Sequence, residues 1–215
     1  MKPLLTTLAC ATALALLSST SYAATPHQTT GSKVAAKNVI FMIGDGMGPA
    51  YLSAYRYYKD DASTKQVEPT IFDQLWVGVA TTYPDDHTVV TDSAAAATAL
   101  STHTKSYNGA IAVDHAHKPL TTMLEIAKAK GMATGIVATA QINHATPAAF
   151  MAHNKTRKAY NEIADDYVDN KVNGKFVADL MFGGGISYFE RKDRNLAAEF
   201  KKAGYQYANT WQDFQ

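Results

Sequence analysis

Short apolar runs alternate with helix-like stretches along most of the chain, and this alternation limits the fold more than any other feature. Residues 38–43 (NVIFMI) are continuously apolar and are followed by glycines, which is typical of a strand buried on both faces. Similar runs predict further strands at residues 77–82, 133–138, 177–182 and 205–208. Helical patterns occur at residues 49–58, 93–100, 120–130, 147–153, 155–170 and 195–203. Strands that alternate with helices predict an α/β fold, with a parallel-rich central sheet covered by helices on both faces.

The first 23 residues have the pattern of a secretory signal peptide. Lys2 precedes an apolar run, and the segment ends in small residues, with Ser21 and Ala23 at the positions that a signal peptidase reads. The run is too short to favour a transmembrane helix. It also contains Cys10, the single cysteine of the sequence, so the expected mature chain has no disulfide and depends on core burial or metal for stability. We therefore expect a periplasmic or secreted protein.

The remaining residues are expected to form a polar leader and one folded region. Residues 24–37 are small and polar and predict a flexible leader, whereas residues 38–215 are enough for a proper core. Residues 209–214 read as the opening of another element, so we expect residues 38–215 to be the N-terminal part of a larger domain. The formal net charge is +1, and this balance gives no indication of a nucleic-acid or membrane partner.

The stretch VTDSAAAAT predicts a plain helix that begins at an Asp-Ser pair. Asp92 and Ser93 are residues that start helices, and the alanines that follow are the best helix formers. A serine in this place is most often a simple cap. A helix N-terminus also attracts anions, and small side chains would let a tetrahedral group approach the backbone. Ser93 is therefore a candidate nucleophile, although neither a G-x-S-x-G nor an S-x-x-K pattern surrounds it.

A metal ion could activate such a serine, and two loops offer ligands. Asp45 lies in GDGMG directly after an expected strand, where ligands gather in α/β sheets. Thr146 precedes Pro147 in HATP and is a second candidate ligand. His144 could be a further ligand, or it could hydrogen-bond to a ligand without binding the metal itself. Each residue also has a simpler explanation, because turn aspartates, helix-capping threonines and loop histidines are common.

Three further features are ambiguous from the residues alone. Arg157 in KTRKAY, at the expected start of a helix, could clamp a phosphate with two parallel hydrogen bonds or could be a solvated surface charge. His115 and His117 resemble a metal-binding tract, but we favour a solvated loop. Residues 183–185 are three glycines that either hold an anion or turn the chain after a strand.

Taken together, these motifs resemble the bacterial and animal alkaline phosphatases. VTDSAAAAT resembles the active-site signature of that family, and NVIFMIGDGMG resembles its first metal-binding strand and loop. HATPAAFMAH followed by TRKAY resembles the segment with its magnesium threonine and phosphate-binding arginine, and FGGG is also similar. The resemblance extends over nearly the whole expected mature chain and keeps the order of the motifs.

The resemblance implies a role for each candidate residue. Ser93 corresponds to the nucleophile that forms a phosphoserine, Arg157 to the arginine that grips the phosphoryl oxygens, and Asp92 to the residue that orients this arginine. Asp45 corresponds to a carboxylate between the second zinc and the magnesium, and Thr146 to a magnesium ligand. His144 occupies a position, aspartate or histidine in the family, that touches a magnesium-bound water.

The resemblance also implies two zinc ions, one magnesium ion, small phosphate monoesters as substrates and a homodimer. Most zinc ligands of the family come from the second half of its polypeptide, and this sequence offers no counterpart that would close the first zinc site. Three functions therefore stay open. They are phosphate monoester hydrolysis, the related hydrolysis of phosphodiesters or sulfate esters, and a catalytically incomplete fragment.

Overall fold

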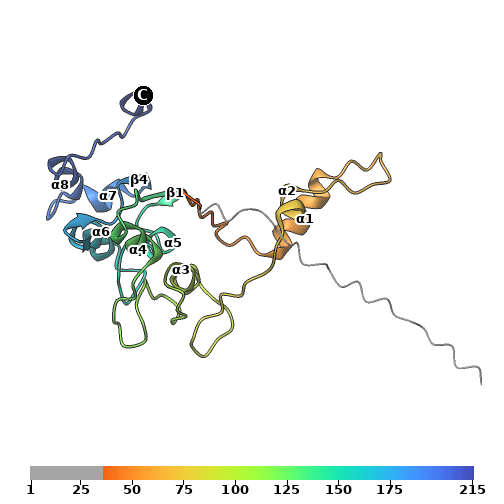
Figure 1. Ribbon diagram of the computed structural model, residues 1–215, viewed down its shortest axis with the longest axis horizontal. Coiled ribbons are helices and arrows are strands. Elements are labelled where there is room, and N and C mark those ends of the chain that lie inside the picture. Colours follow the sequence, from red (N-terminus) through yellow and green to blue (C-terminus); the bar gives the residue numbers. More distant parts are fainter. Residues whose placement is uncertain (1–35) are drawn as a thin grey trace, which may run out of the picture. The chain divides into compact units, whose positions relative to one another are not determined.

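The computed structural model describes residues 36–215, and the chain divides into two units, residues 1–42 and 43–215. The expected signal peptide and nearly all of the expected leader lie outside the described residues. Within the first unit, residues 36–42 form no helix or strand. The second unit contains the elements labelled in Figure 1. Its helices are α1 (Pro49–Lys59), α2 (Ile71–Leu75), α3 (Ser93–Thr102), α4 (Met123–Ala129), α5 (Ala145–Ala148), α6 (Tyr160–Asp169), α7 (Ile186–Phe189), α8 (Leu196–Lys202) and α9 (Trp211–Phe214). Its strands are β1 (Gly135–Gln141), β2 (Lys171–Val172), β3 (Lys175–Phe176) and β4 (Leu180–Gly184).

The predicted α/β class is confirmed by the pairing of β1 with β4, which run parallel. Gly135 lies opposite Leu180 in this pair, and the register shifts between Val137 and Gln141. Parallel strands need a crossover connection, and the segment with α5 and α6 provides it. β2 and β3 form a separate antiparallel pair.

In the described part of the chain, one face of the β1–β4 sheet packs on the core, and the other is largely exposed, although Phe182 there contacts the Phe214 ring. Ile136 and Met181 pack against the core, whereas the alternate residues Val137 and Phe182 are 67% and 40% exposed. Residues 36–215 therefore show a parallel sheet with helices packed on one face, and the other face is largely exposed in this part of the chain. A continuous apolar run indicates that a strand can be buried on both faces. It does not determine which elements pack against the second face of the sheet.

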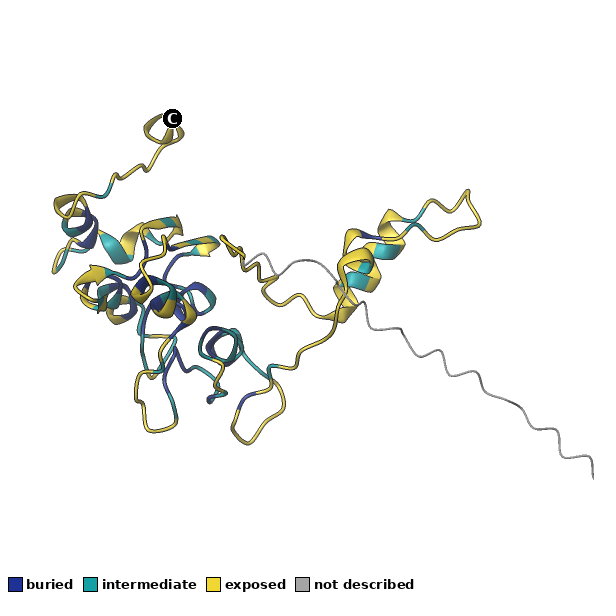
Figure 2. Cartoon of the chain, in the orientation of Figure 1, coloured by how far each residue is buried: buried dark blue, intermediate teal, exposed yellow. Residues whose placement is uncertain are grey.

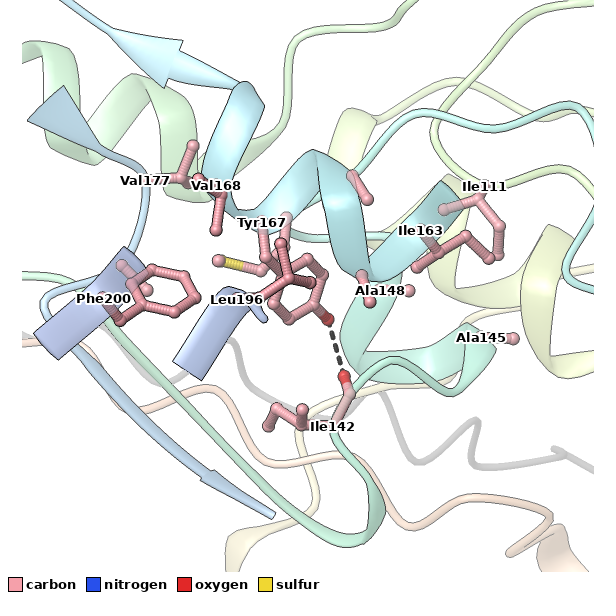
Figure 3. Close-up of a cluster of buried hydrophobic side chains, with 14 of the residues drawn as sticks. Ile111, Ile142, Ala145, Ala148, Ile163, Tyr167, Val168, Val177, Leu196 and Phe200 are labelled. Carbon is pink, nitrogen blue, oxygen red and sulfur yellow. Dashed lines mark hydrogen bonds between the residues drawn. The ribbon is translucent and has the colours of Figure 1, made fainter. Parts of the chain in front are cut away.

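The core lies between the covered sheet face and helices α5, α6 and α8 (Figure 3). Its largest fully buried side chain is that of Tyr167, and its hydroxyl donates to the Ile142 carbonyl at 2.6 Å. Burial raises the pKa of this phenol, so it stays neutral and acts as a donor. The bond fixes α6 to the end of β1, where the chain turns towards the HATP segment.

Three of the predicted strands are absent from the structure. Residues 38–43, 77–82 and 205–208 form no ladder, and Ile40 and Val77 are almost fully exposed, at 87% and 102%. A strand needs a neighbouring edge that takes up its N–H and C=O groups. The described residues give these runs no such edge, and Figure 2 accordingly draws most of residues 36–92 as exposed.

Helix predictions hold better, because a helix satisfies its own backbone groups. α1, α3, α4 and α8 lie within one to three residues of the predicted bounds. Two predictions were less accurate. The helix predicted at residues 147–153 is the shorter and earlier α5, Ala145–Ala148, and the one predicted at residues 155–170 begins only at Tyr160. The expected cap Gly131 does follow α4, with a φ of +76° that favours glycine. In the described residues no helix is long and apolar enough to cross a bilayer.

A buried polar network supports the turn that leads to Arg157. The Glu125 carboxylate on α4 accepts hydrogen bonds from the Thr122 backbone N–H at 2.7 Å and from the Asn170 side chain at 2.8 Å. It also lies 3.0 Å from His153 Nε2. His153 Nδ1 lies 2.9 Å from the Ala112 carbonyl. Both ring nitrogens therefore face acceptors, which favours the doubly protonated imidazolium.

The same contacts shift both pKa values. Burial alone would lower the pKa of His153, but the hydrogen bonds to Glu125 and Ala112 and the charges of Glu125 and Asp166 raise it overall. Burial alone would raise the pKa of Glu125, but its hydrogen bonds to His153, Thr122 and Asn170 lower it to about 2. Asp166 accepts from the His153 backbone N–H at 2.7 Å, and burial raises the pKa of this carboxyl.

These shifts predict how the stability depends on pH. The His153 contribution is complete below its ordinary pKa of 6.5 and is lost as pH rises through the higher folded value. The Glu125 contribution is complete above 4.5 and is lost as pH falls towards about 2. The free energy of unfolding of the wild type, minus that of His153→Gln, should therefore fall above pH 6.5, by at most about 1.4 kcal/mol per pH unit. Urea titrations between pH 5 and pH 9, roughly the range where histidine titrates, would measure this, with the exposed His87→Gln as the control. A difference that does not change with pH would contradict the assignment.

Candidate active site

The candidate site starts at the N-terminus of α3, where Asp92 is the cap. Asp92 has extended backbone angles, and its Oδ1 accepts from the Ala95 N–H at 2.9 Å. Ser93 is the first helical residue, as the sequence predicts. The first N–H groups of a helix lack intrahelical acceptors, so this end carries partial positive charge beside the Ser93 hydroxyl.

Arg157 joins this helix end from a turn 64 residues further along the chain. Its Nη1 donates to Ser93 Oγ at 2.9 Å and to Asp92 Oδ2 at 3.1 Å. The side chains of Arg157 and Asp92 are 23% and 28% exposed, so the pair is partly shielded from water. Arg157 lies before α6 rather than inside a helix, which corrects the predicted helix start at residue 155. Serine, carboxylate and guanidinium are thus brought together as the sequence predicts.

His144 lies on the other side of the same guanidinium. Arg157 Nη2 is 3.2 Å from His144 Nε2. A guanidinium can only donate, so Nε2 must accept, and this requires a neutral imidazole with its proton on Nδ1. The structure therefore places His144 against the arginine, and its predicted contact with a magnesium-bound water stays a prediction.

Asp45 and Thr146 form a second pair of candidate residues. Thr146 Oγ1 donates to Asp45 Oδ2 at 2.8 Å. Asp45 lies in a tight turn in which Gly46 has a φ of +68°, and Thr146 lies in α5, two residues after His144. The two loops that offer candidate metal ligands are therefore in contact.

These oxygens fit one kind of metal better than another. A carboxylate and a hydroxyl suit a hard cation such as magnesium, which keeps several waters and needs few protein ligands. Zinc sites usually need three or four histidine, cysteine or carboxylate ligands. No group of three such side chains that could hold a metal ion occurs in residues 36–215. Asp45 and Thr146 could thus provide two of the ligands of a magnesium site. The described residues do not complete a zinc site.

A seam of alanines brings the two parts of the site close together. Ala94 and Ala97 of α3 are buried against α5 and the residue after it, where Ala148 and Ala149 are fully buried. Side chains this small let two helix backbones approach closely. The alanines of the signature therefore pack against a neighbouring helix, in addition to leaving space beside Ser93.

Enlarging this seam should be destabilising. We expect Ala148→Leu to lower the free energy of unfolding by about 1–3 kcal/mol, because the added atoms have no space between α3 and α5. Ala129→Leu is the matched control, since Ala129 is exposed on α4. Urea unfolding of the two variants measures the difference. Equal stability of Ala148→Leu and the control would contradict close packing of the seam.

The other sequence candidates have structural rather than chemical surroundings. His115 lies 3.6 Å from Asp85 and, like His117, beside the Tyr107 ring, and no metal cluster includes either in the described residues. Gly183 lies so close to Ile142 that an added Cβ would be 3.0 Å from that side chain. The glycines after residue 182 therefore provide close packing and a turn.

The loop at Asn108 and Gly109, which contacts Asp92 beside Ser93 and also Arg157, was not predicted from the sequence. The Asn108 side chain accepts from the Asp92 N–H at 2.8 Å, and the Gly109 carbonyl accepts from the Arg157 N–H at 2.8 Å. An Asn-Gly pair is an ordinary turn signal, and this explains why the sequence alone gives no hint of the contact.

Comparison with known proteins places these motifs in one family. The sequence profile described as alkaline phosphatase matches residues 36–215. Alkaline phosphatase 3 of Bacillus subtilis is 58% identical over 192 residues, which are 89% of this chain and 42% of that protein. A crystal structure of the cold-active alkaline phosphatase from a Shewanella species has 54% identity and a TM-score of 0.69, and the match covers 78% of this chain and 40% of that one.

A variant of the TAB5 alkaline phosphatase, solved with magnesium bound in its M3 site, has 34% identity and a TM-score of 0.64. That match covers 77% of this chain and 46% of the TAB5 chain. The chain spans about two fifths of the length of the Bacillus relative. Family profile, relatives and solved structures agree along most of the described chain, and the chain therefore belongs to the alkaline phosphatase family.

Proposed function

We propose that this chain supplies the nucleophile and the phosphate-binding arginine of an enzyme that hydrolyses phosphate monoesters. One observation carries the proposal. A single guanidinium, that of Arg157, contacts both the Ser93 hydroxyl at 2.9 Å and the Asp92 carboxylate at 3.1 Å, at the start of a helix. Membership of the alkaline phosphatase family supports the same reaction.

In this proposal the residues of the chain divide the work. Arg157 and the first N–H groups of α3 bind the phosphoryl oxygens, and Asp92 orients the arginine. Ser93 Oγ forms the new bond to phosphorus while the ester oxygen leaves as an alcohol, which takes up the proton that the serine gives away. Water then cleaves the phosphoserine, which restores the hydroxyl and releases phosphate.

Metal ions are part of the proposal. When bound, they would supply a lowered pKa for the serine hydroxyl and neutralise phosphoryl charge. Asp45 and Thr146 would share in holding magnesium, because their oxygens are in contact. The TAB5 variant with bound magnesium supports a magnesium ion in a member of this family. For the two zinc ions that the resemblance implies, the described residues give no complete site.

The proposal extends to the location and assembly of the protein. The pattern of residues 1–23 supports export to the periplasm or the medium. The homodimer rests on the family resemblance. The expected substrates are small phosphate monoesters, because Ser93, Arg157 and the start of α3 are all proposed to contact the phosphoryl group rather than the rest of the substrate.

The proposal is tested by transplanting the chain into a relative. Residues 36–215 would replace the matching region of Bacillus subtilis alkaline phosphatase 3, and hydrolysis of a chromogenic phosphate monoester would be measured with zinc and magnesium and then with a chelator. We expect hydrolysis that the chelator abolishes. Faster turnover of a diester or a sulfate ester would favour the related hydrolases. A folded but inactive chimera would contradict the proposal, and the 215-residue chain assayed in parallel reports what it does by itself.

A further inference from the structure

The loop at Asn108 and Gly109 connects the two segments that carry Ser93 and Arg157. The Asn108 Oδ1 accepts from the Asp92 N–H at 2.8 Å, and its Nδ2 donates to the Val90 carbonyl at 3.0 Å. One side chain thus holds the extended segment before α3 by two backbone groups. That segment sets where the helix begins and where Ser93 points.

The next residue holds the arginine. The Gly109 carbonyl accepts from the Arg157 N–H at 2.8 Å. Gly109 has a φ of +94°, a conformation that favours glycine. Two residues further on, Ile111 and Asn154 exchange a pair of backbone hydrogen bonds, each of 2.9 Å, which fixes the same two segments in register.

These contacts close on themselves. Asn108 binds residues 90 and 92, Gly109 binds the Arg157 backbone, and the Arg157 side chain returns to Asp92 and Ser93. We call residues 90–93, 108–109 and 157 the contact ring. Thr98 joins the body of α3 to the Ala110 carbonyl and the Ala112 N–H, but within the ring the Asn108 side chain is the part that joins the extended segment before Ser93 to the loop. Its loss therefore frees residues 90–92 and leaves α3 itself attached.

We propose that Asn108 is a positioning residue, which sets Ser93 and Arg157 in the relative placement that an anion such as a phosphoryl group requires. The inference deepens the proposed function and rests on it for the identity of the ligand. Asn108 acts through the Val90–Asp92 backbone rather than by touching the ligand. A displacement of about 1 Å in such an arrangement is enough for a large loss of function.

The test compares Asn108→Ala with a matched control in the 215-residue chain. Asn195→Ala is suitable, because Asn195 also binds a backbone N–H, that of Ala198 at 2.8 Å, but at the start of α8. Three quantities are measured by NMR. They are the hydrogen exchange of the Asp92 N–H, the line width of the Arg157 Nε–H signal, and the response of the Ser93 and Ala94 amides to inorganic phosphate.

We expect Asn108→Ala to speed exchange at Asp92, to broaden the Arg157 Nε–H signal and to weaken phosphate binding about 10-fold, with Asn195→Ala unchanged on all three. Asn108→Asp keeps an oxygen for the Asp92 N–H and should retain its protection, which provides a second variant if the alanine variant is poorly folded. An unchanged Arg157 signal in a folded Asn108→Ala would overturn the inference.

The two proposals can fail separately. If the Ser93 and Ala94 amides of the wild type do not respond to phosphate, but Asn108→Ala still broadens the Arg157 Nε–H signal, the proposed function fails and the positioning role stands. If the wild type binds phosphate and Asn108→Ala changes neither the Arg157 signal nor the affinity, the positioning role is wrong and the proposed function stands.

Discussion

Ser93→Ala is expected to reduce phosphate monoester hydrolysis by a factor on the order of 10⁴–10⁶, with little change in the stability of the fold. The reduction follows because Ser93 Oγ is the atom proposed to bond to phosphorus, and alanine has no atom in that place. The fold should tolerate the change, since Asp92 caps α3 through its own carboxylate and alanine is a strong helix former. Only the hydrogen bond from Arg157 is lost, a contribution of about 1 kcal/mol.

The measurement compares initial rates of the chimera with and without the substitution, together with its urea unfolding. Ser53→Ala is the matched control, because the Ser53 hydroxyl also makes one local contact, to the Pro49 carbonyl at 3.4 Å, on the exposed α1. A Ser93→Ala variant that keeps a rate near that of the control would show that another group attacks the phosphoryl, and the proposed role of Ser93 would be wrong.

Glu125→Ala is expected to have the largest effect on stability, about 3–5 kcal/mol. The substitution leaves His153 charged and half-paired in a buried place, and it also removes the acceptor from the Thr122 N–H and from Asn170. An uncompensated buried charge is more destabilising than the loss of an exposed ion pair, because water cannot replace the missing partner. Glu125 also closes the capping box of α4, so that helix loses part of its start signal.

Glu162→Ala is the control for this prediction, since Glu162 is an exposed glutamate in the first turn of α6. Glu125→Gln is informative as well, because it keeps an oxygen for one of the three donors and should lose less than the alanine variant. The free energies of unfolding in urea at pH 6 separate the three, since at about this pH both Glu125 and His153 are expected to be charged. A loss in Glu125→Ala no larger than that of the control would mean that the network contributes little.

The candidate site was more predictable from the sequence than the fold around it. Asp92, Ser93, Arg157 and the Asp45–Thr146 pair were all singled out by residue type and motif, and the structure brings each group together. Their chemical roles stay predictions that only activity and binding measurements address. The contact of His144 with the arginine was not predicted, because a motif names a residue but does not say which of two neighbours its ring nitrogen faces.

The strand predictions failed for a different reason. The runs at residues 38–43 and 77–82 have the composition of buried strands, yet a strand exists only where another strand completes its hydrogen bonds. Residues 133–138 found such a partner in β4, and the ladder begins two residues later than predicted. A helix carries its hydrogen bonds within itself, which is why α3 and α8 could be predicted from local pattern alone. The Asn108 contacts join residues far apart in sequence, and no local pattern contains them.

The alanine seam between α3 and α5 has a consequence for how the site responds to heat. Alanine has no rotamers, so the contact of Ala94 and Ala97 with Ala148 and Ala149 has no alternative side-chain arrangement to populate on warming. Leucine side chains in the same place could change rotamer on warming. The alanine contacts can change only if the backbones of α3 and α5 move relative to each other. The separation of Ser93 from His144 should therefore stay nearly constant with temperature until the two helices part together.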